Sequence, residues 1–302
     1  PLYKFRHIDF SMPDVVYGFN DSCHVQFMQT ILPTSSKQYV HFPHFPVFQP
    51  IAPERAADTE GKERRIFFAG SAHVMFRKLS LQPERILTNS RFRSLYDRLG
   101  VVDRLTDELG NNDFRLDEFI RSSLQTIAET NLFKNAESFI ECDVFMRAMR
   151  RRLIVKWISC LPLALIGEGW HDAMATRSRD IRIFKPLDYF STEHIVRSHY
   201  SVGLNIFQGQ ICGPHDRIYN AAAAGQVLVS DANRFLREFP VESYVSLSPF
   251  REDVAVAACS RALFDIPAER YVRELSSYLL RRSDLSVQSA ARRVLESVKR
   301  DG

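Results

Sequence analysis

The sequence predicts an α/β protein built on a Rossmann-like parallel sheet, with a helical insertion and a reduced or truncated N-terminal part. Two observations lead to this prediction. Short apolar runs, each closed by glycine, proline or aspartate, alternate with segments that can form short helices from residue 65 to about residue 248. The spacing of these runs is that of parallel βαβ units. With 45% hydrophobic residues in 302, the chain also carries enough apolar surface to bury a large core.

Each apolar run is short enough to be a buried strand that enters a turn. The expected strands are 66–69, 163–166, 181–184, 202–207, 227–230 and 244–247. The segments between the later strands favour short helices, at 191–199, 214–224 and 233–238. Further helices are expected from there to the C-terminus.

Residues 80–160 are expected to form the helical insertion. Apolar residues then recur at steps of three and four, which is the period of one helix face. These residues are Phe139, Cys142, Met146, Met149, Leu153, Trp157 and Cys160. We therefore predict a long, partly buried helix over 139–160, ended by Pro162, with Phe139, Met146, Met149, Leu153 and Trp157 facing inward.

Residues 1–62 differ in composition from the rest, being rich in proline, histidine and phenylalanine, and residues 52–64 are expected to form a polar linker. We interpret 1–62 as the remnant or end of an N-terminal domain, and 63–302 as the main domain. The chain opens with Pro1 instead of Met, which favours a processed end or a fragment of a longer chain.

Composition excludes several classes of protein. A net charge of +4 is too small to indicate nucleic-acid binding by itself. The five cysteines are scattered without a CxxC pair, so neither a zinc site nor a disulfide framework is expected. No apolar run reaches the roughly 20 residues that span a bilayer, and no signal peptide is visible. We expect a cytoplasmic protein without a transmembrane segment.

The segment 212–225 is the tightest candidate for a binding site. Gly213 allows a tight turn, Pro214 suits the first helical position, and the following alanines form a helix that Gly225 ends. This helix starts beyond the carboxyl end of the strand at 202–207, where ligands bind in doubly wound sheets. Arg217 would add a charge for an anion. The alternative is that Arg217 is a solvated helix residue.

Two further turns are candidates. Gly70 and Ser71 follow the first strand, where a turn can bring the backbone close to a phosphate, although an ordinary turn explains the pair equally simply. Gly169 and Trp170 follow the second strand; Trp170 is either a shelf for a flat ring or a structural plug. No GxGxxG, P-loop or metal-ligand spacing occurs, so no cofactor and no metal are expected.

Five segments in this order resemble the C-terminal half of GT-B glycosyltransferases. They are RIFFAGS at 65–71, LIGEGW at 165–170, LNI at 204–206, RIYNAAAAG at 217–225 and VLVSD at 227–231. The succession is most similar to the CgeB-like branch of family-1-type enzymes. The resemblance implies that residues 63–302 are a GT-B donor-binding domain and that the N-terminal remnant belongs to the acceptor-side domain.

The resemblance also implies roles for individual residues. A nucleoside-diphosphate-sugar donor, which is a substrate and not a cofactor, would be bound by Gly70, Ser71, Gly169, Trp170, Gly213, His215, Arg217 and Asn220. Asn220 stands where the family has an acidic residue that grips the ribose hydroxyls. Asp21 and His24 are the nominated catalytic residues, and a polar turn or helix cap is their alternative role.

The expected activity is that of a metal-independent, hexosyltransferase-like glycosyltransferase. It would transfer sugar from the nucleotide-sugar donor to a glycan, protein or small-molecule acceptor. The sequence leaves two alternatives open. One is a non-catalytic nucleotide- or sugar-binding module, and the other is an interaction protein whose helical insertion docks a partner. Neither the acceptor nor the oligomeric state follows from the residues.

Overall fold

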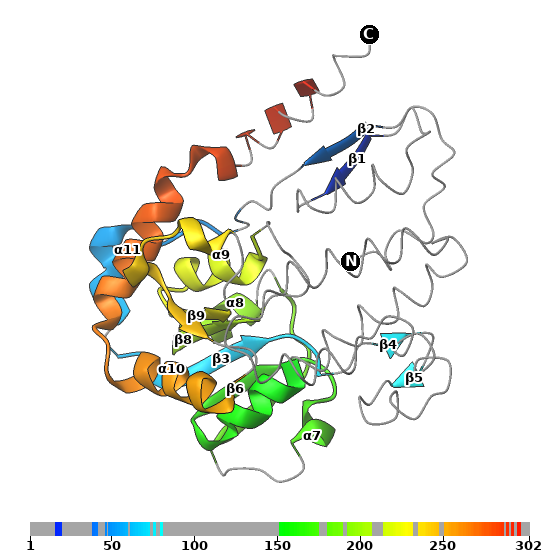
Figure 1. Cartoon of the computed structure of the whole chain (residues 1–302), viewed down its shortest axis with the longest axis vertical. Helices are drawn as coiled ribbons and strands as arrows, with labels where there is room; N and C mark the ends of the chain where they lie inside the picture. Colours follow the sequence, from blue (N-terminus) through cyan, green and yellow to red (C-terminus); the bar gives the residue numbers. More distant parts are fainter. Residues whose placement is uncertain are drawn as a thin grey trace.

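The computed structural model describes part of the chain (Figure 1). The described residues are 16–19, 38–41, 46, 48–59, 61–72, 75–76, 79–80, 151–174, 180–189, 192–206, 214–231, 235–247, 251–286, 288–289, 291–292 and 295–296.

A six-stranded sheet, parallel throughout, forms the centre of the described part. Its strands are β3 (Glu63–Ala69), β6 (Leu163–Ile166), β7 (Ile181–Phe184), β8 (Tyr200–Asn205), β9 (Val227–Asp231) and β10 (Val245–Leu247). Their order across the sheet is β10-β9-β8-β3-β6-β7. Numbered along the chain from β3, this is the order 3-2-1-4-5-6 of a doubly wound Rossmann sheet. The α/β fold class expected from the sequence is therefore confirmed.

The strand order fixes where the direction of winding reverses. After β3 the chain adds β6 and β7 on one side, and it then returns to the other side of β3 with β8, β9 and β10. The connections that follow β3 and β8 consequently leave on opposite faces at the carboxyl edge. In open α/β sheets this switch point is where a crevice for ligands forms.

Helices cover both faces of this sheet (Figure 1). The regular helices are α7 (Trp170–Ala173), α8 (Thr192–Ser198), α9 (Asp216–Ala223), α10 (Glu252–Phe264) and α11 (Ala268–Arg281). Residues 151–157 are also helical and continue into the 3-10 turn η4 (Ile158–Cys160). Further 3-10 turns are η2 (Pro53–Thr59), η5 (Leu236–Glu238), η6 (Val241–Ser243) and η7 (Ser283–Leu285). Among the described residues, no helix is long and apolar enough to cross a membrane.

Two short pairs of strands lie outside the main sheet. The strands β1 (Val16–Phe19) and β2 (Gln38–His41) pair in parallel, and β4 (Met75–Phe76) pairs antiparallel with β5 (Leu79–Ser80). Parallel pairing needs a crossover of about a dozen residues or more, which the separation between β1 and β2 provides.

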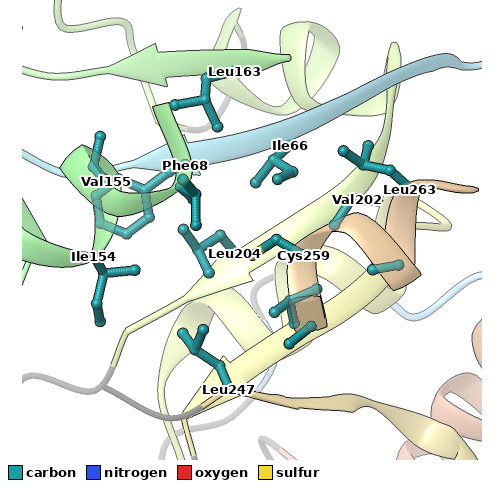
Figure 2. Packing of buried hydrophobic residues seen from close by; sticks show 14 of the residues in the cluster. Ile66, Phe68, Ile154, Val155, Leu163, Val202, Leu204, Leu247, Cys259 and Leu263 are labelled. Carbon is teal, nitrogen blue, oxygen red and sulfur yellow. The ribbon is translucent and has the colours of Figure 1, made fainter. Parts of the chain in front are cut away.

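The alternation of side chains along β3 divides the core between the two faces of the sheet. Ile66 and Phe68 belong to a large buried cluster beneath α10 and the helix at 151–157 (Figure 2). Leu204 and Cys259 belong to the same cluster. Phe67 packs on the opposite face with Tyr200. Residues buried on both faces explain why these strands read as uninterrupted apolar runs in the sequence.

Helix α11 joins two clusters of the core. Its Val272 belongs to the cluster under α10, whereas Leu275 packs with the buried face of α9. The segment 52–64, expected to be a polar linker, also takes part: η2 packs on α11 and Ala56 is fully buried, and β3 already begins at Glu63. The linker expectation missed this because a single small apolar residue leaves no periodic pattern.

Only the last part of the predicted 139–160 helix lies within the described residues, and there its predicted inward face is half-buried, with Trp157 packed against the main core cluster. Ile154, Val155 and Ile158 are fully buried, whereas Leu153 and Trp157 are half-buried. This stretch is apolar on most of its circumference. The three-four spacing therefore fits more than one face, and packing against the sheet decides between them.

Candidate functional site

Three segments meet at the carboxyl edge of the sheet, around the switch point between β3 and β8. They are the turn at Gly70 and Ser71 after β3, the turn at 167–170 after β6, and the start of α9. Parallel strands end at one edge of a sheet, so turns that follow such strands can meet there. Direct hydrogen bonds connect all three segments.

The first two turns are bonded to one another backbone to backbone. The amide of Gly70 donates to Ile166 O at 2.8 Å, and the amide of Ala72 donates to Glu168 O at 2.8 Å. The hydroxyl of Ser71 accepts from the amide of Glu168 at 3.3 Å. Since both strands are central in the sheet, this bonding fixes the turn after β3 against its neighbour.

Glycine is required where the two turns touch. Gly167 has a φ of 137°, and a Cβ at this position would lie 2.5 Å from Gly70 O, far inside van der Waals contact. The backbone conformation and the space therefore both exclude a side chain.

Trp170 sits beneath this junction. Its indole is fully buried, meets the ring of Phe68 edge-on at 5.9 Å, and donates from Nε1 to Gly70 O at 2.6 Å. Gly169, at φ 79°, precedes it as the N-cap of α7. This is the geometry of the structural-plug alternative; a role of Gly169 and Trp170 beside the base of a donor stays a prediction.

The start of α9 is capped by His215. The imidazole Nδ1 accepts from the amide of Arg217 at 3.2 Å, and the His215 carbonyl accepts from the amide of Ile218 at 3.0 Å. The His215 ring also contacts the carboxylate of Asp216. Two amides at this helix start are thus already paired within the protein, so an anion here would depend on side chains more than on the helix end.

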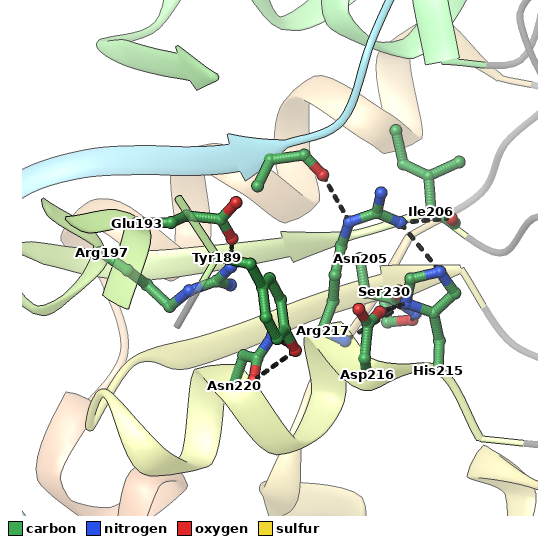
Figure 3. Close-up of polar contacts among 11 residues, drawn as sticks. Tyr189, Glu193, Arg197, Asn205, Ile206, His215, Asp216, Arg217, Asn220 and Ser230 are labelled. Atoms are coloured by element: carbon green, nitrogen blue, oxygen red, sulfur yellow. Dashed lines mark hydrogen bonds and ion pairs between the residues drawn. The ribbon is translucent and has the colours of Figure 1, made fainter. Parts of the chain in front are cut away.

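Arg217 bridges the switch point (Figure 3). Its Nε donates to Ala69 O at the end of β3 at 2.7 Å, and its Nη1 donates to Ile206 O after β8 at 3.4 Å. The guanidinium also lies over the ring of Phe68 at 4.9 Å. The remaining nitrogen, Nη2, lies against Gly70: a Cβ there would be 2.8 Å away. Arg217 is therefore not the solvated helix residue of the alternative interpretation.

The charge of Arg217 is buried without a carboxylate partner. The side chain belongs to a residue only 7% exposed, and burial lowers the pKa of Arg217, opposed mainly by the charge of Asp216. Within the described part of the chain, no carboxylate forms an ion pair with Arg217, and its guanidinium contacts carbonyl oxygens and an imidazole. Buried charges are ordinarily paired, so this arrangement leaves room for an anion.

Arg197 is a second buried arginine, and its charge is paired within the protein. It is 3% exposed, lies over the ring of Phe67 at 4.8 Å, and forms an ion pair with Glu193 one turn earlier in α8. Burial lowers the pKa of Arg197 too, but the charge of Glu193 opposes that effect directly. The two arginines differ in whether the protein itself supplies the negative charge.

Asn220 lies one turn after Arg217 on α9 and is paired with Tyr189. The phenol donates to Asn220 Oδ1 at 3.3 Å and accepts from Asn220 Nδ2 at 2.9 Å (Figure 3). Sequence reasoning singled out Asn220 and missed Tyr189, which follows β7 at the far side of the sheet. Nothing in the local pattern around Tyr189 connects it with α9.

A second polar group, also missed, lies at the ends of β8 and β9. Asn205 Nδ2 donates to Ser230 Oγ at 2.8 Å, and Ser230 Oγ donates to Asp231 O at 2.9 Å. Asn205 is fully buried, and its Oδ1 has no hydrogen-bond partner among the described residues. The only sequence signal was the presence of Asn205 in an otherwise apolar strand.

The candidate site thus brings together Gly70, Ser71, Gly169, Trp170, His215 and Arg217, with Asn220 one helical turn away. Gly213, Asp21 and His24 lie outside the described residues. No group of three or more histidine, cysteine or carboxylate side chains that could hold a metal ion occurs among the residues described.

No protein-family model and no curated protein sequence matches this chain. Solved structures similar to it include AviGT4, a glycosyltransferase involved in avilamycin A biosynthesis, with 17% identity and a TM-score of 0.41 over 85% of this chain and 57% of that one. A UDP-forming trehalose-phosphate synthase from Burkholderia xenovorans has 13% identity and a TM-score of 0.45 over 94% of this chain and 61% of that one.

A third structure is the Escherichia coli trehalose-6-phosphate protein bound with UDP-2-fluoro glucose, with 13% identity and a TM-score of 0.42 over 94% of this chain and 60% of that one. The chain spans about three fifths of the length of these proteins. The similarity concerns the fold alone, and at these TM-scores it carries no argument about activity or substrate.

Proposed function

We propose that the switch point between β3 and β8 binds the diphosphate of a nucleoside-diphosphate sugar, and that the protein is a glycosyltransferase that uses this donor. One observation carries the proposal: the buried guanidinium of Arg217, which forms no ion pair with a carboxylate of the described residues, lies at the switch point, with Nη2 beside the Gly70 turn. The resemblance of the five sequence segments to GT-B glycosyltransferases supports the same class of ligand.

Burying the charge of Arg217 has a cost. Removing a guanidinium from water is unfavourable by about several kcal/mol after relaxation of the protein. The neutral carbonyl partners at Ala69 and Ile206 recover only part of that cost. An anion near Nη2 would supply the missing charge. A phosphate also matches the forked geometry of arginine, whose hydrogen bonds to phosphate are strong and directional.

The same residues suit the chemistry of glycosyl transfer. As the bond between sugar and diphosphate breaks, negative charge grows on the departing diphosphate. A guanidinium held in place by two carbonyl oxygens and an aromatic ring need not reorganise to stabilise that charge. The bonded turns at Gly70 and Gly167 would keep the backbone facing the phosphates in position.

The acceptor side of the reaction is also part of the proposal. Asp21 and His24 remain the candidates for the group that removes the proton from the acceptor hydroxyl. The acceptor class stays open between a glycan, a protein and a small molecule. We propose a cytoplasmic enzyme that needs no metal ion, because Arg217 would provide the charge stabilisation for the diphosphate.

A second candidate function is a nucleotide-binding module without turnover. Two observations favour it: an amide stands at Asn220 in place of a carboxylate, and the amides at the start of α9 are paired with His215. Release of nucleoside diphosphate from nucleotide sugars, measured with and without candidate acceptors, separates the two functions.

The test compares the two buried arginines. In Arg217→Gln we expect adenosine, guanosine or uridine diphosphate, whichever the protein binds, to lose affinity roughly 10-fold to 150-fold, since a charged hydrogen bond contributes about 1.5–3 kcal/mol. Arg217→Lys keeps the charge but not the fork, so it should recover only part of the affinity. Isothermal titration calorimetry measures both effects.

The control is the double variant Glu193→Gln/Arg197→Gln, which removes the paired charge without leaving a buried carboxylate unpaired. It should bind the diphosphate with unchanged affinity. Equal loss of affinity in both, or no loss in Arg217→Gln, would contradict the assignment of Arg217 to the ligand.

A further inference from the structure

The contact between Tyr189 and Asn220 has the form of a ligand contact. One hydroxyl both donates to the oxygen and accepts from the nitrogen of a single side-chain amide. The hydroxyl comes from a part of the chain far from α9, and any alcohol in the same place could form the same two bonds.

An asparagine at position 220 is unfavourable for the stability of α9. It is 2% exposed and is followed by the alanines of a helix packed on the sheet, where asparagine lowers helix propensity and its amide needs partners. Tyr189 provides those partners in this structure. Burial raises the pKa of Tyr189, so the phenol stays protonated near neutral pH and can donate as well as accept.

The position of Asn220 relative to Arg217 suits one ligand that reaches both. Residues three apart on a helix share a face, with Cβ atoms about 5–6 Å from each other. A nucleotide carries its phosphates and its ribose hydroxyls at a comparable separation. A diphosphate at Arg217 would therefore bring ribose hydroxyls toward the amide that Tyr189 now covers.

The segment that carries Tyr189 is suited to being displaced. Residues 185–189 form an irregular stretch after β7, in which Lys185, Pro186 and Asp188 are exposed. Leu187 is half-buried against the cluster around Phe67, and the ring of Tyr189 lies 6.0 Å from that of Phe48.

We propose that Tyr189 gates the ligand site: its hydroxyl occupies a hydroxyl-recognition position at Asn220 and must be displaced by a ribose hydroxyl of the bound nucleotide. This inference rests on the proposed function, since it concerns the same ligand. Tyr189 thereby competes with the nucleotide, and the identity of this residue sets how much affinity the ribose contributes.

The experiment removes only the competing hydroxyl. Tyr189→Phe keeps the ring, so adenosine, guanosine or uridine diphosphate, whichever binds, should bind about tenfold more tightly by calorimetry. The 2′,3′-dideoxy analogue of the same nucleotide should show no gain, because it brings no hydroxyl to Asn220. Tyr244→Phe, at another half-buried tyrosine, is the matched control and should leave both affinities unchanged.

A third variant ties the effect to Asn220. In Asn220→Ala the diphosphate and its dideoxy analogue should bind equally, and adding Tyr189→Phe should then change neither. Unchanged or weaker binding by Tyr189→Phe, or an equal gain with the dideoxy analogue, overturns the gate. If the unmodified protein still binds the nucleotide in that case, the proposed function stands. If neither the unmodified protein nor Tyr189→Phe binds any of the three nucleotides, both proposals fail.

Discussion

The two buried arginines, Arg197 and Arg217, are about equally buried but differ in how their charges are balanced. Arg197 lies over Phe67 and is neutralised by Glu193, so its role is complete within the protein. Arg217 lies over Phe68, bonds to two strand-end carbonyls and lacks an ion pair among the described residues. Burial alone therefore does not distinguish the two arginines, and the missing counter-charge is the reason why we propose Arg217 as the anion-binding residue.

His194 offers a prediction about stability and pH. Its ring stacks on Phe48 at 4.3 Å, and its Nδ1 is buried without a hydrogen-bond partner. Burial lowers the pKa of His194 from its ordinary 6.5, and the charges of Arg197 and Lys62 lower it further. The folded protein therefore takes up this proton less readily than the unfolded chain.

The sign of the effect follows from that difference. The contribution of His194 is fully present above pH 6.5 and is lost as the pH falls from about 6.5 through the lowered pKa of the folded state. His194→Phe keeps the stacked ring without the titration, so its free energy of unfolding should fall less between pH 7.5 and pH 5.5. The difference should be below about 1 kcal/mol, because the ring is partly solvated. Identical decreases in the free energy of unfolding of both proteins, measured by urea unfolding, would show that His194 does not cause this pH dependence.

At the residue scale, sequence reasoning could find some site residues and not others. Arg217 and Asn220 were accessible because they lie in a segment with a turn signal and a helix signal. The pair Glu193 and Arg197 also had a signal, the i,i+4 spacing in an expected helix. Tyr189 had none, and Asn205 had only its place in an apolar strand, because their partners are distant in the sequence and only the folded sheet brings them together.

At the scale of elements, the apolar runs predicted the strands well. Strands β6 and β7 have the predicted bounds, and the other four differ at one or both ends, as β8 does by starting at Tyr200 and ending at Asn205. The buried parallel strand is a strong local signal, since both of its faces must be apolar. The helix before Pro162 was predicted as an element, but its most deeply buried residues, Ile154, Val155 and Ile158, lie beside the predicted face, because the choice between its apolar faces depends on the sheet.

The junction between the turns after β3 and β6 leads to a prediction at this scale. Trp170→Phe keeps an aromatic ring but removes the donor to Gly70 O, so we expect a loss of about 1–3 kcal/mol in the free energy of unfolding. The other tryptophan of the chain, Trp157, is half-buried. Trp157→Phe is the control, with a smaller expected loss in the free energy of unfolding. Chemical denaturation measures both; equal costs would mean that the bond to Gly70 does not hold the junction.

For the molecule as a whole, no local sequence pattern predicted the order of the strands in the sheet. The alternation of strands and helices predicted a parallel sheet, but the pairing of β3 with both β6 and β8 depends on contacts among distant segments. That pairing creates the switch point, and with it the place where Arg217 bridges the ends of β3 and β8. The site therefore follows from topology as much as from the residues themselves.

The measurement that tests the account most directly is a crystal structure of the protein with a bound nucleoside diphosphate. We predict a phosphate oxygen within hydrogen-bond distance of Arg217 Nη2, next to the Gly70 turn, while Nε keeps its bond to Ala69 O. A diphosphate bound away from the ends of β3 and β8, with Arg217 contacting only the protein, would contradict the claim that this buried guanidinium is the anion site.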